Sequence, residues 1–149
     1  MIAEFKGDVE SLRGVVGQWR GESKIGIMMH GDIDVFMRHL QSLIDAPDCV
    51  LFALYSDGRP VGFIGGMLFI SHLNGKLCAN EQNWYVMTDH RGIGSLRLKR
   101  RLEKWAYERG AWKLLMTASA LAGDDHERIC KLYEKDMQYF ETTYIKDLR

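Results

Sequence analysis

The sequence predicts an α/β fold with its elements in the order α-α-β-β-β-α-β-α-β. Apolar residues recur at helical spacing in several segments, and apolar runs of strand length lie between and after them. Asp57-Gly58 and Asn74-Gly75 have the turn chemistry of tight hairpins and separate the first three strands. A turn with two glycines then joins the third strand to a long amphipathic helix.

Length and composition indicate one globular domain over residues 1–149, with 46% hydrophobic and 27% charged residues. Twenty basic residues balance twenty acidic ones, so no overall field favours a nucleic acid or a membrane as partner. The N-terminus lacks a basic-then-apolar leader, and no apolar run approaches the roughly 18 residues of a membrane span. The three scattered cysteines fit reduced thiols, and together these features predict a cytoplasmic protein.

Two helices are expected before the first strand, each begun by an aspartate that can cap its free amides. Asp8 precedes the first helix, whose apolar face would consist of Val9, Leu12, Val16 and Trp19. Residues 21–31 carry glycines and no clean period, which predicts a loop. Asp32 precedes the second helix, whose buried stripe would consist of Val35, Phe36, Leu40, Leu43 and Ile44. Pro47 then ends this helix.

The three strands that follow are expected at residues 49–55, 61–70 and 77–87. The last of them leads into the turn Arg91-Gly92-Ile93-Gly94, and a helix continues to Gly110. Glycines let backbone N–H groups approach an anion closely, and a helix N-terminus aims its free amides and positive dipole end at the same point. The turn therefore predicts a phosphate cradle.

The C-terminal third is expected to contain a strand at residues 112–118, a helix and a final strand at residues 139–145. Asp124 and Glu127 resemble a capping box for that helix. Its apolar face would consist of Ile129, Leu132 and Tyr133.

Most other motifs point away from specific chemistry. The basic run Arg97, Lys99, Arg100, Arg101 and Lys104 is interpreted first as a solvated helix face, or else as an attraction for a phosphorylated cofactor. The five histidines show no metal-ligand spacing, and no serine-hydrolase elbow or P-loop is present. Taken alone, Glu81 is either an exposed strand residue or a poised base, and the strand pattern favours the first. Taken alone, Tyr133 is a core aromatic residue.

Together these segments resemble the GNAT superfamily of acetyl-CoA-dependent N-acetyltransferases, in particular its small bacterial and phage-type members. The resemblance is carried by residues 81–86 (EQNWYV), 91–94 (RGIG), 103–110 (EKWAYERG) and 132–135 (LYEK). The order of elements also matches from about residue 8 onward. The resemblance therefore covers nearly the whole domain.

The resemblance implies a mixed sheet whose fourth and fifth strands splay apart, with acetyl-CoA in the gap and no metal. Glu81 matches the glutamate that serves some members as general base, and Tyr133 matches the tyrosine that protonates the departing thiolate. Pantetheine would pair with the backbone of Tyr85, Val86 and Met87. Pyrophosphate would rest on the backbone amides of Arg91, Gly92, Ile93, Gly94, Ser95 and Leu96.

The resemblance thus implies direct acetyl transfer from acetyl-CoA to a primary amine in a ternary complex. The expected partners are a small-molecule amine or a protein or peptide amine, and a second copy of the chain in a homodimer. The acceptor would enter beside the first two helices and the loop 21–31, where specificity would depend on Lys24, Met28, Met29 and His30.

A second interpretation is a non-catalytic module of the same fold that binds CoA or a protein partner. The family pattern, Arg/Gln-x-x-Gly-x-Gly/Ala, fits Arg91 and Gly94 but meets Leu96 at its last position. Aligning Gly92 and Gly94 with both glycines puts Asp89 at the basic position instead. A bulky or acidic residue there would crowd the phosphates and favours the module, whereas retention of both Glu81 and Tyr133 favours the enzyme.

Overall fold

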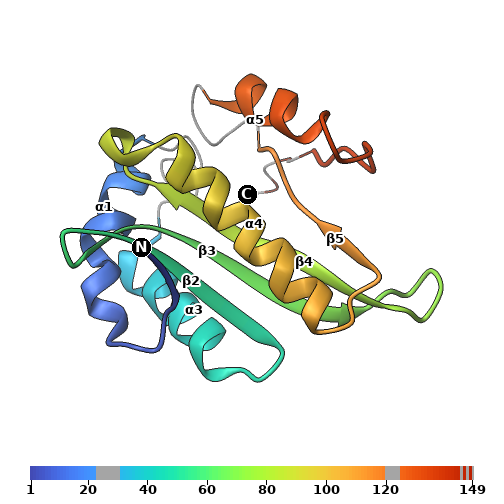
Figure 1. The fold of residues 1–149 in the computed structure, drawn as a ribbon, viewed down its shortest axis with the longest axis horizontal. Helices are drawn as coiled ribbons and strands as arrows, with labels where there is room; N and C mark the ends of the chain where they lie inside the picture. The colour runs from blue at the N-terminus through green and yellow to red at the C-terminus, as the bar shows by residue number, and fades with distance from the viewer. Residues whose placement is uncertain (23–30, 120–124, 145, 147, 149) are drawn as a thin grey trace.

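The computed structural model describes the chain except for residues 23–30, 120–124, 145, 147 and 149. Its centre is a five-stranded mixed sheet in the order β1-β2-β3-β4-β5 (Figure 1). The strands are β1 (Ile2–Glu4), β2 (Cys49–Ser56), β3 (Arg59–Ile70), β4 (Leu77–Val86) and β5 (Lys113–Leu115). Strands β1 to β4 pair antiparallel, and β5 pairs parallel to β4.

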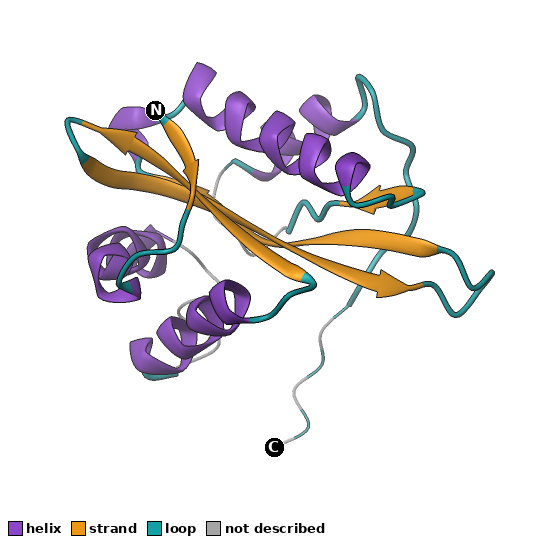
Figure 2. Ribbon diagram, turned by 60° about the horizontal axis from the view of Figure 1, so that its bottom comes forward, coloured by secondary structure: helices purple, strands orange, loops and turns teal. Residues whose placement is uncertain are grey.

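Helices cover both faces of this sheet, as Figure 2 shows. One face carries α1 (Arg13–Glu22), which follows the 3₁₀ turn η1 (Val9–Leu12), and α3 (Ile33–Asp45). The other carries α4 (Ile93–Glu108), which follows the 3₁₀ turn η2 (Thr88–His90). Helix α5 (His126–Tyr133) lies near α4, beyond the end of β5 (Figure 1).

The sequence signals that begin the two N-terminal helices act as expected. The Asp8 carboxylate accepts from the Glu10 amide at 3.0 Å, and the Asp32 carboxylate accepts from the Asp34 amide at 3.0 Å. In the β2–β3 hairpin, Asp57 and Gly58 both have positive φ, 49° and 75°, as a tight two-residue turn requires.

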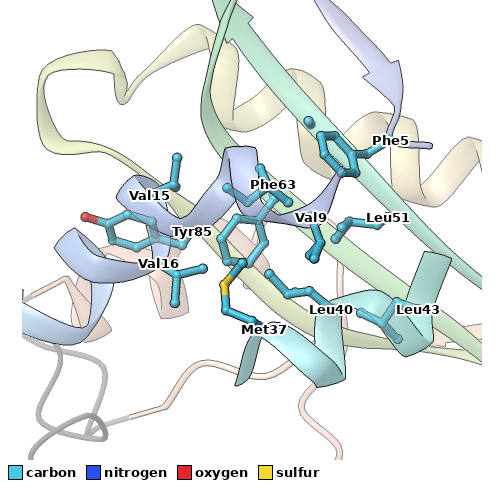
Figure 3. Packing of buried hydrophobic residues seen from close by; sticks show 12 residues of the cluster. Phe5, Val9, Val15, Val16, Met37, Leu40, Leu43, Leu51, Phe63 and Tyr85 are labelled. Carbon is cyan, nitrogen blue, oxygen red and sulfur yellow. The ribbon is translucent and has the colours of Figure 1, made fainter. Parts of the chain in front are cut away.

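Each face of the sheet buries its own hydrophobic cluster. Under α1 and α3 the side chains interdigitate around Phe63 and Tyr85, which lie side by side on β3 and β4 (Figure 3). Under α4 the cluster is built on Leu98, Leu102 and Trp105 of the helix. These three residues belong to the helix face that the sequence predicted, and Gly110 follows the helix with φ of 79°.

Strands β4 and β5 splay apart as expected. They pair only over Cys78–Asn80 of β4 and Lys113–Leu115 of β5, although β4 runs on to Val86. The edge of β4 that turns away from β3 is therefore unpaired by β5 from Glu81 onward. We call the point where the two strands separate the fork.

Several expectations about the elements were wrong. Strand β1 was missed, because three residues are too short to show a period. The final strand at 139–145 does not form in its described part, where Tyr139, Phe140 and Tyr144 are exposed. The predicted strand 112–118 is reduced to Lys113–Leu115. Val35 is 55% exposed, so it does not belong to the buried stripe of α3.

Two expectations fall outside the described residues. One is Asp124 of the predicted capping box, and the other is most of the loop 21–31, with its four expected specificity residues. Gly21 and Glu22 are described, and they belong to α1 rather than to a loop.

Candidate active site

Glu81 occupies the first position of β4 beyond its last pair with β5. It lies opposite Gly66 of β3, and a side chain at Gly66 would meet Leu102 and Trp105 of α4, so Glu81 is on the α4 face of the sheet. A β-bulge follows at Gln82, which faces α3 beside Leu43.

The bulge shifts the alternation of side chains along β4. It keeps Glu81 on the same face as Trp84 and Val86, both of which pack in the α4 cluster, while Tyr85 packs in the opposite cluster. A regular strand would have placed Glu81 and Tyr85 on one face. The bulge is thus what lets β4 contribute a carboxylate to the fork and an aromatic ring to the other core.

The carboxyl group of Glu81 spans the fork. The backbone N–H of Thr117, just beyond β5, donates to its Oε2 at 3.3 Å. Burial raises the pKa of Glu81 to about 7, although the Thr117 hydrogen bond acts in the opposite direction. Glu81 is therefore held where its protonation changes near neutral pH, which suits a general base.

Tyr133, the last residue of α5, is near enough to Glu81 for the carboxylate to influence its phenol. Its side chain is 9% exposed, and its hydroxyl has no hydrogen-bond partner in the described part of the chain. The pKa of this phenol is raised by burial first, and then by the Glu81 carboxylate and the Cys130 side chain. The hydroxyl is therefore available for a hydrogen bond to a bound molecule.

The turn before α4 has the form of an anion cradle. Gly92 is the N-cap residue with φ of 114° and ψ of −128°, and no side chain caps the first amides of the helix. Gly92 and the next residues, Ile93, Gly94 and Ser95, are wholly or partly exposed. Uncapped amides at a helix N-terminus attract anions through their N–H groups and the helix dipole.

The two glycines of the turn have different physical roles. Gly92 needs its positive φ, and an added Cβ would meet no atom within 4 Å. At Gly94 an added Cβ would lie 2.8 Å from Cδ2 of Leu54 on β2. Position 94 therefore requires glycine because α4 approaches the sheet there, whereas Gly92 gives the turn its backbone conformation.

The side chain of Arg91 is engaged within the protein. Its Nη2 donates to Glu22 at 2.6 Å, its Nη1 to Asp125 at 2.9 Å, and its Nε to the Val86 carbonyl at 2.9 Å. It also lies 5.5 Å from the ring centroid of Tyr85. Arg91 thereby joins α1, β4 and the start of α5. Its backbone amide donates to the Thr88 carbonyl at 3.3 Å, so neither its side chain nor its amide is left for the cradle that the sequence predicted.

Two of the predicted pantetheine-pairing groups also have partners. The Met87 amide donates to the Val61 carbonyl of β3 at 2.9 Å, and the Val86 carbonyl accepts from Arg91. Because backbone groups alternate in direction along a strand, Val86 rather than Met87 points its amide away from β3.

Sequence reasoning missed several residues that shape this site. Glu22 also accepts from the Thr88 hydroxyl at 2.7 Å, and it raises the pKa of Tyr85, already raised by burial, to about 12. The basic run on α4 is not a wholly solvated face, because Lys99 is buried. Glu22, Asp125 and Thr117 lie far in sequence from the motifs they contact, and no local pattern marks them.

One surface hollow of about 320 Å³ is lined by η1, Arg13 and α3, and another of about 200 Å³ is lined by α5 and Glu134. The described residues contain no cluster of three metal-ligating side chains and no helix suited to crossing a membrane.

A family model described as the acetyltransferase (GNAT) family matches residues 19–139. The chain belongs to the GNAT acetyltransferases. A search of curated protein sequences finds no match.

Solved structures share the fold at low identity. A ribosomal-protein-alanine N-acetyltransferase from Brucella melitensis biovar Abortus 2308 is 22% identical, with a TM-score of 0.72 and 99% of both chains covered. The aminoglycoside N-acetyltransferase AAC(6')-Iy in complex with CoA is 17% identical, with a TM-score of 0.76, over 100% of this chain and 94% of that one. A transcriptional regulator from Bacillus halodurans C-125 is 13% identical, with a TM-score of 0.70, over 97% of this chain and 100% of that one.

Proposed function

We propose that this GNAT protein transfers the acetyl group of acetyl-CoA to a primary amine, directly and within a ternary complex. The observation that supports the proposal is the buried Glu81 carboxyl at the fork, which accepts from Thr117 and is near enough to Tyr133 to raise the pKa of its phenol. One residue comes from the middle of the sheet and the other from the end of a distant helix. Both carry groups able to move protons.

The residues around the fork fit CoA as co-substrate. The uncapped amides at the start of α4 would hold the pyrophosphate, with Gly92, Ile93, Gly94 and Ser95 as the contributing residues. The amide of Leu96, which the sequence also predicted there, instead donates to the Gly92 carbonyl at 3.2 Å. The Val86 amide would pair with pantetheine on the edge of β4 that β5 leaves unpaired. CoA itself supplies the thioester that makes the acetyl group transferable.

Glu81 would act as the general base. A protonated amine has no free electron pair, so its proton must leave before it can attack a carbonyl carbon. A carboxylate whose pKa is about 7 accepts that proton more readily than one at the ordinary value of 4.5. It can do so directly or through one water molecule.

Tyr133 would act as the general acid. A phenol is protonated at neutral pH even at its ordinary pKa of 10, and burial raises the pKa of Tyr133 further, so Tyr133 carries a proton that it can donate to the sulfur that leaves. Its unpartnered hydroxyl leaves this hydrogen bond free to form.

The acceptor is proposed as a class, a small-molecule amine or an amine of a protein or peptide. One solved structure of AAC(6')-Iy, 18% identical, with a TM-score of 0.75, over 100% of this chain and 97% of that one, holds a bisubstrate analogue, CoA-S-monomethyl-acetylneamine. The Brucella enzyme is named for an alanine of a ribosomal protein. We therefore propose both types of amine as acceptors of this protein. We also propose that it acts in the cytoplasm and as a homodimer.

The alternative function is a non-catalytic module that binds CoA or a protein partner. It is favoured by the ion pairs that occupy the Arg91 side chain, and by Leu96, which stands exposed at the last position of the family's glycine pattern. The fold match to a transcriptional regulator shows that this architecture also occurs in proteins of other names.

Thiol release from acetyl-CoA in the presence of an amine panel tests the proposal. We expect Glu81→Gln and Tyr133→Phe each to lower kcat about 100-fold, the lower end of the usual range for a lost proton-transfer group. Exposed residues supply matched controls, Glu127→Gln and Tyr107→Phe, which should retain wild-type rates. Equal rates in all variants would refute the assigned roles.

Calorimetric titration separates the two functions. Micromolar acetyl-CoA binding corresponds to about −8 kcal/mol. Binding without amine-dependent thiol release would support the module, and no binding at millimolar acetyl-CoA would reject the enzyme.

A further inference from the structure

Helix α5 has little apolar attachment to the rest of the domain. Of its eight residues only Tyr133 is buried, and the others are exposed or partly exposed. An isolated helix of this length is not stable in water, so tertiary contacts must hold it in place. Besides the burial of Tyr133, two ion pairs among the described residues attach it, one near each end.

The C-terminal end is held by a buried lysine. Lys99 lies on α4 with its side chain 5% exposed, and its Nζ donates to Asp136 Oδ2 at 3.1 Å and to Glu103. The Asp136 and Met137 amides both donate to the Tyr133 carbonyl, at 3.2 and 2.8 Å. The ion pair is thus attached to the residue that carries the phenol.

The N-terminal end is held by the turn before α4. Asp125 is the N-cap residue of α5, yet its side chain makes no capping hydrogen bond. Its carboxylate instead accepts from Arg91 Nη1 at 2.9 Å. An aspartate at an N-cap ordinarily serves the helix amides, so this one is diverted to a contact between elements.

We propose that Lys99 and Arg91 are positioning residues that hold α5 at both ends and so fix the Tyr133 phenol beside Glu81 at the fork. The inference rests on the proposed acetyl transfer. It extends that proposal by giving positioning roles to Lys99 and Arg91, which are not among the reacting groups. The same helix that offers its N-terminus to pyrophosphate thereby also sets the place of the proton donor.

The burial of Lys99 favours positioning over simple stabilisation. Removing an ammonium group from water is costly, and a well-packed apolar residue at such a site is often as stable or more stable. What a buried pair supplies is a defined geometry between the two elements that carry it. Here those elements are α4 and the end of α5.

A double-mutant cycle tests the proposal. Asp136→Ala is the main variant, because Asp136 is 58% exposed and its loss should leave the fold intact. Lys99→Met and Asp125→Ala accompany it. Lys104→Met is the matched control, since Lys104 lies on the same helix but pairs only with Glu108, at 3.7 Å, among the ion pairs of the described residues. All are measured in wild-type and Tyr133→Phe backgrounds.

We expect Asp136→Ala to lower kcat about tenfold, with KM for acetyl-CoA changed less than about twofold, because a small misplacement of a reacting group slows the chemical step. In the Tyr133→Phe background the same change should cost less than about twofold, because the phenol it positions is already gone. A full tenfold loss in both backgrounds would overturn the proposal.

Amide hydrogen exchange of residues 126–133 supplies a readout that needs no catalysis. Exchange should be faster in Asp136→Ala, Asp125→Ala and Lys99→Met than in Lys104→Met. If the wild-type protein transfers no acetyl group, the proposed function fails and exchange alone decides whether the two ion pairs hold α5. Unchanged exchange in all variants would overturn the proposal.

Discussion

At the scale of single residues, Glu81 owes its properties to its place in the strand. The same carboxylate one position along β4 would face α3, as Gln82 does, because successive side chains of a strand point to opposite faces. At the fork it is half-buried and has one backbone donor, Thr117. Desolvation therefore outweighs the hydrogen bond, and the pKa of Glu81 rises to about 7.

The first prediction concerns the pH dependence of catalysis. Because the base must be ionised, kcat should fall as pH decreases through about 7, the pKa of Glu81. Glu81→Gln should remove this inflection and leave only the titration of the amine. The measurement is kcat against pH for both proteins with one acceptor, and an unchanged inflection in the variant would assign the base elsewhere.

The second prediction concerns stability. The pKa of Glu81 is higher in the folded protein, at about 7, than the ordinary 4.5. Its favourable contribution is therefore fully present below pH 4.5 and is lost as pH rises through about 7. Near pH 8 the free energy of unfolding of Glu81→Gln, measured in urea, should exceed that of the wild type by up to about 3 kcal/mol. Near pH 4 the two proteins should be similar, and a larger gain there would contradict this account.

At the scale of elements, the N-terminus of α4 combines two requirements in one turn. Gly92 supplies a backbone conformation that other residues rarely adopt, and Gly94 lets the helix approach Leu54. The sequence predicted this element well, since a glycine turn between a strand and an apolar stripe is a local pattern. The sequence did not predict that the two glycines have different roles, because the role of Gly94 depends on its contact with β2.

The third prediction separates strain from function. Gly92→Ala and Gly75→Ala both place a side chain at positive φ, 114° and 68°, so each should lose stability, by about 1–3 kcal/mol. Only Gly92→Ala should also weaken acetyl-CoA binding, because Gly75 lies in the β3–β4 turn. Thermal unfolding and calorimetric titration of both variants check this. Equal affinity in the two would remove Gly92 from the cradle.

At the scale of the whole molecule, contacts between distant segments assemble the site. Glu22 and Arg91 are 69 residues apart, Arg91 and Asp125 are 34 apart, and Lys99 and Asp136 are 37 apart. Glu81 and Tyr133 could be proposed from sequence because they resemble a family pattern. The ionic partners could not, because nothing local distinguishes them from solvated charges.

The two ends of the chain show the same limit. Strand β1 forms because β2 offers an edge to it, and a three-residue segment has no period of its own to reveal this. Residues 139–144 have the aromatic and β-branched composition of a strand but form none. Composition predicts which segments can become strands, whereas an available edge decides which of them do.

The fourth prediction addresses the Arg91 network. Arg91→Met removes three hydrogen bonds from a side chain that is 27% exposed, and it should cost about 1–3 kcal/mol of unfolding free energy. Arg109→Met is the matched control. Arg109 also donates to a carbonyl, that of Pro47, and pairs with Asp48, but it is 38% exposed. Its loss should cost less than about 1 kcal/mol. Urea unfolding measures both, and equal losses would contradict a special role for Arg91.

The shortness of β5 also bears on how copies of the protein meet in concentrated solution. A long bare sheet edge invites strands of other molecules and leads to aggregation. In the described part of the chain nothing pairs with the outer edge of β5, but that edge is only Lys113–Leu115. The ring of Trp112 just before it lies 4.3 Å from the Lys76 ammonium and 4.9 Å from that of Lys113. The brevity of β5 thus leaves little template for other strands on its own outer edge, and the Lys76 and Lys113 ammonium groups place two positive charges beside it.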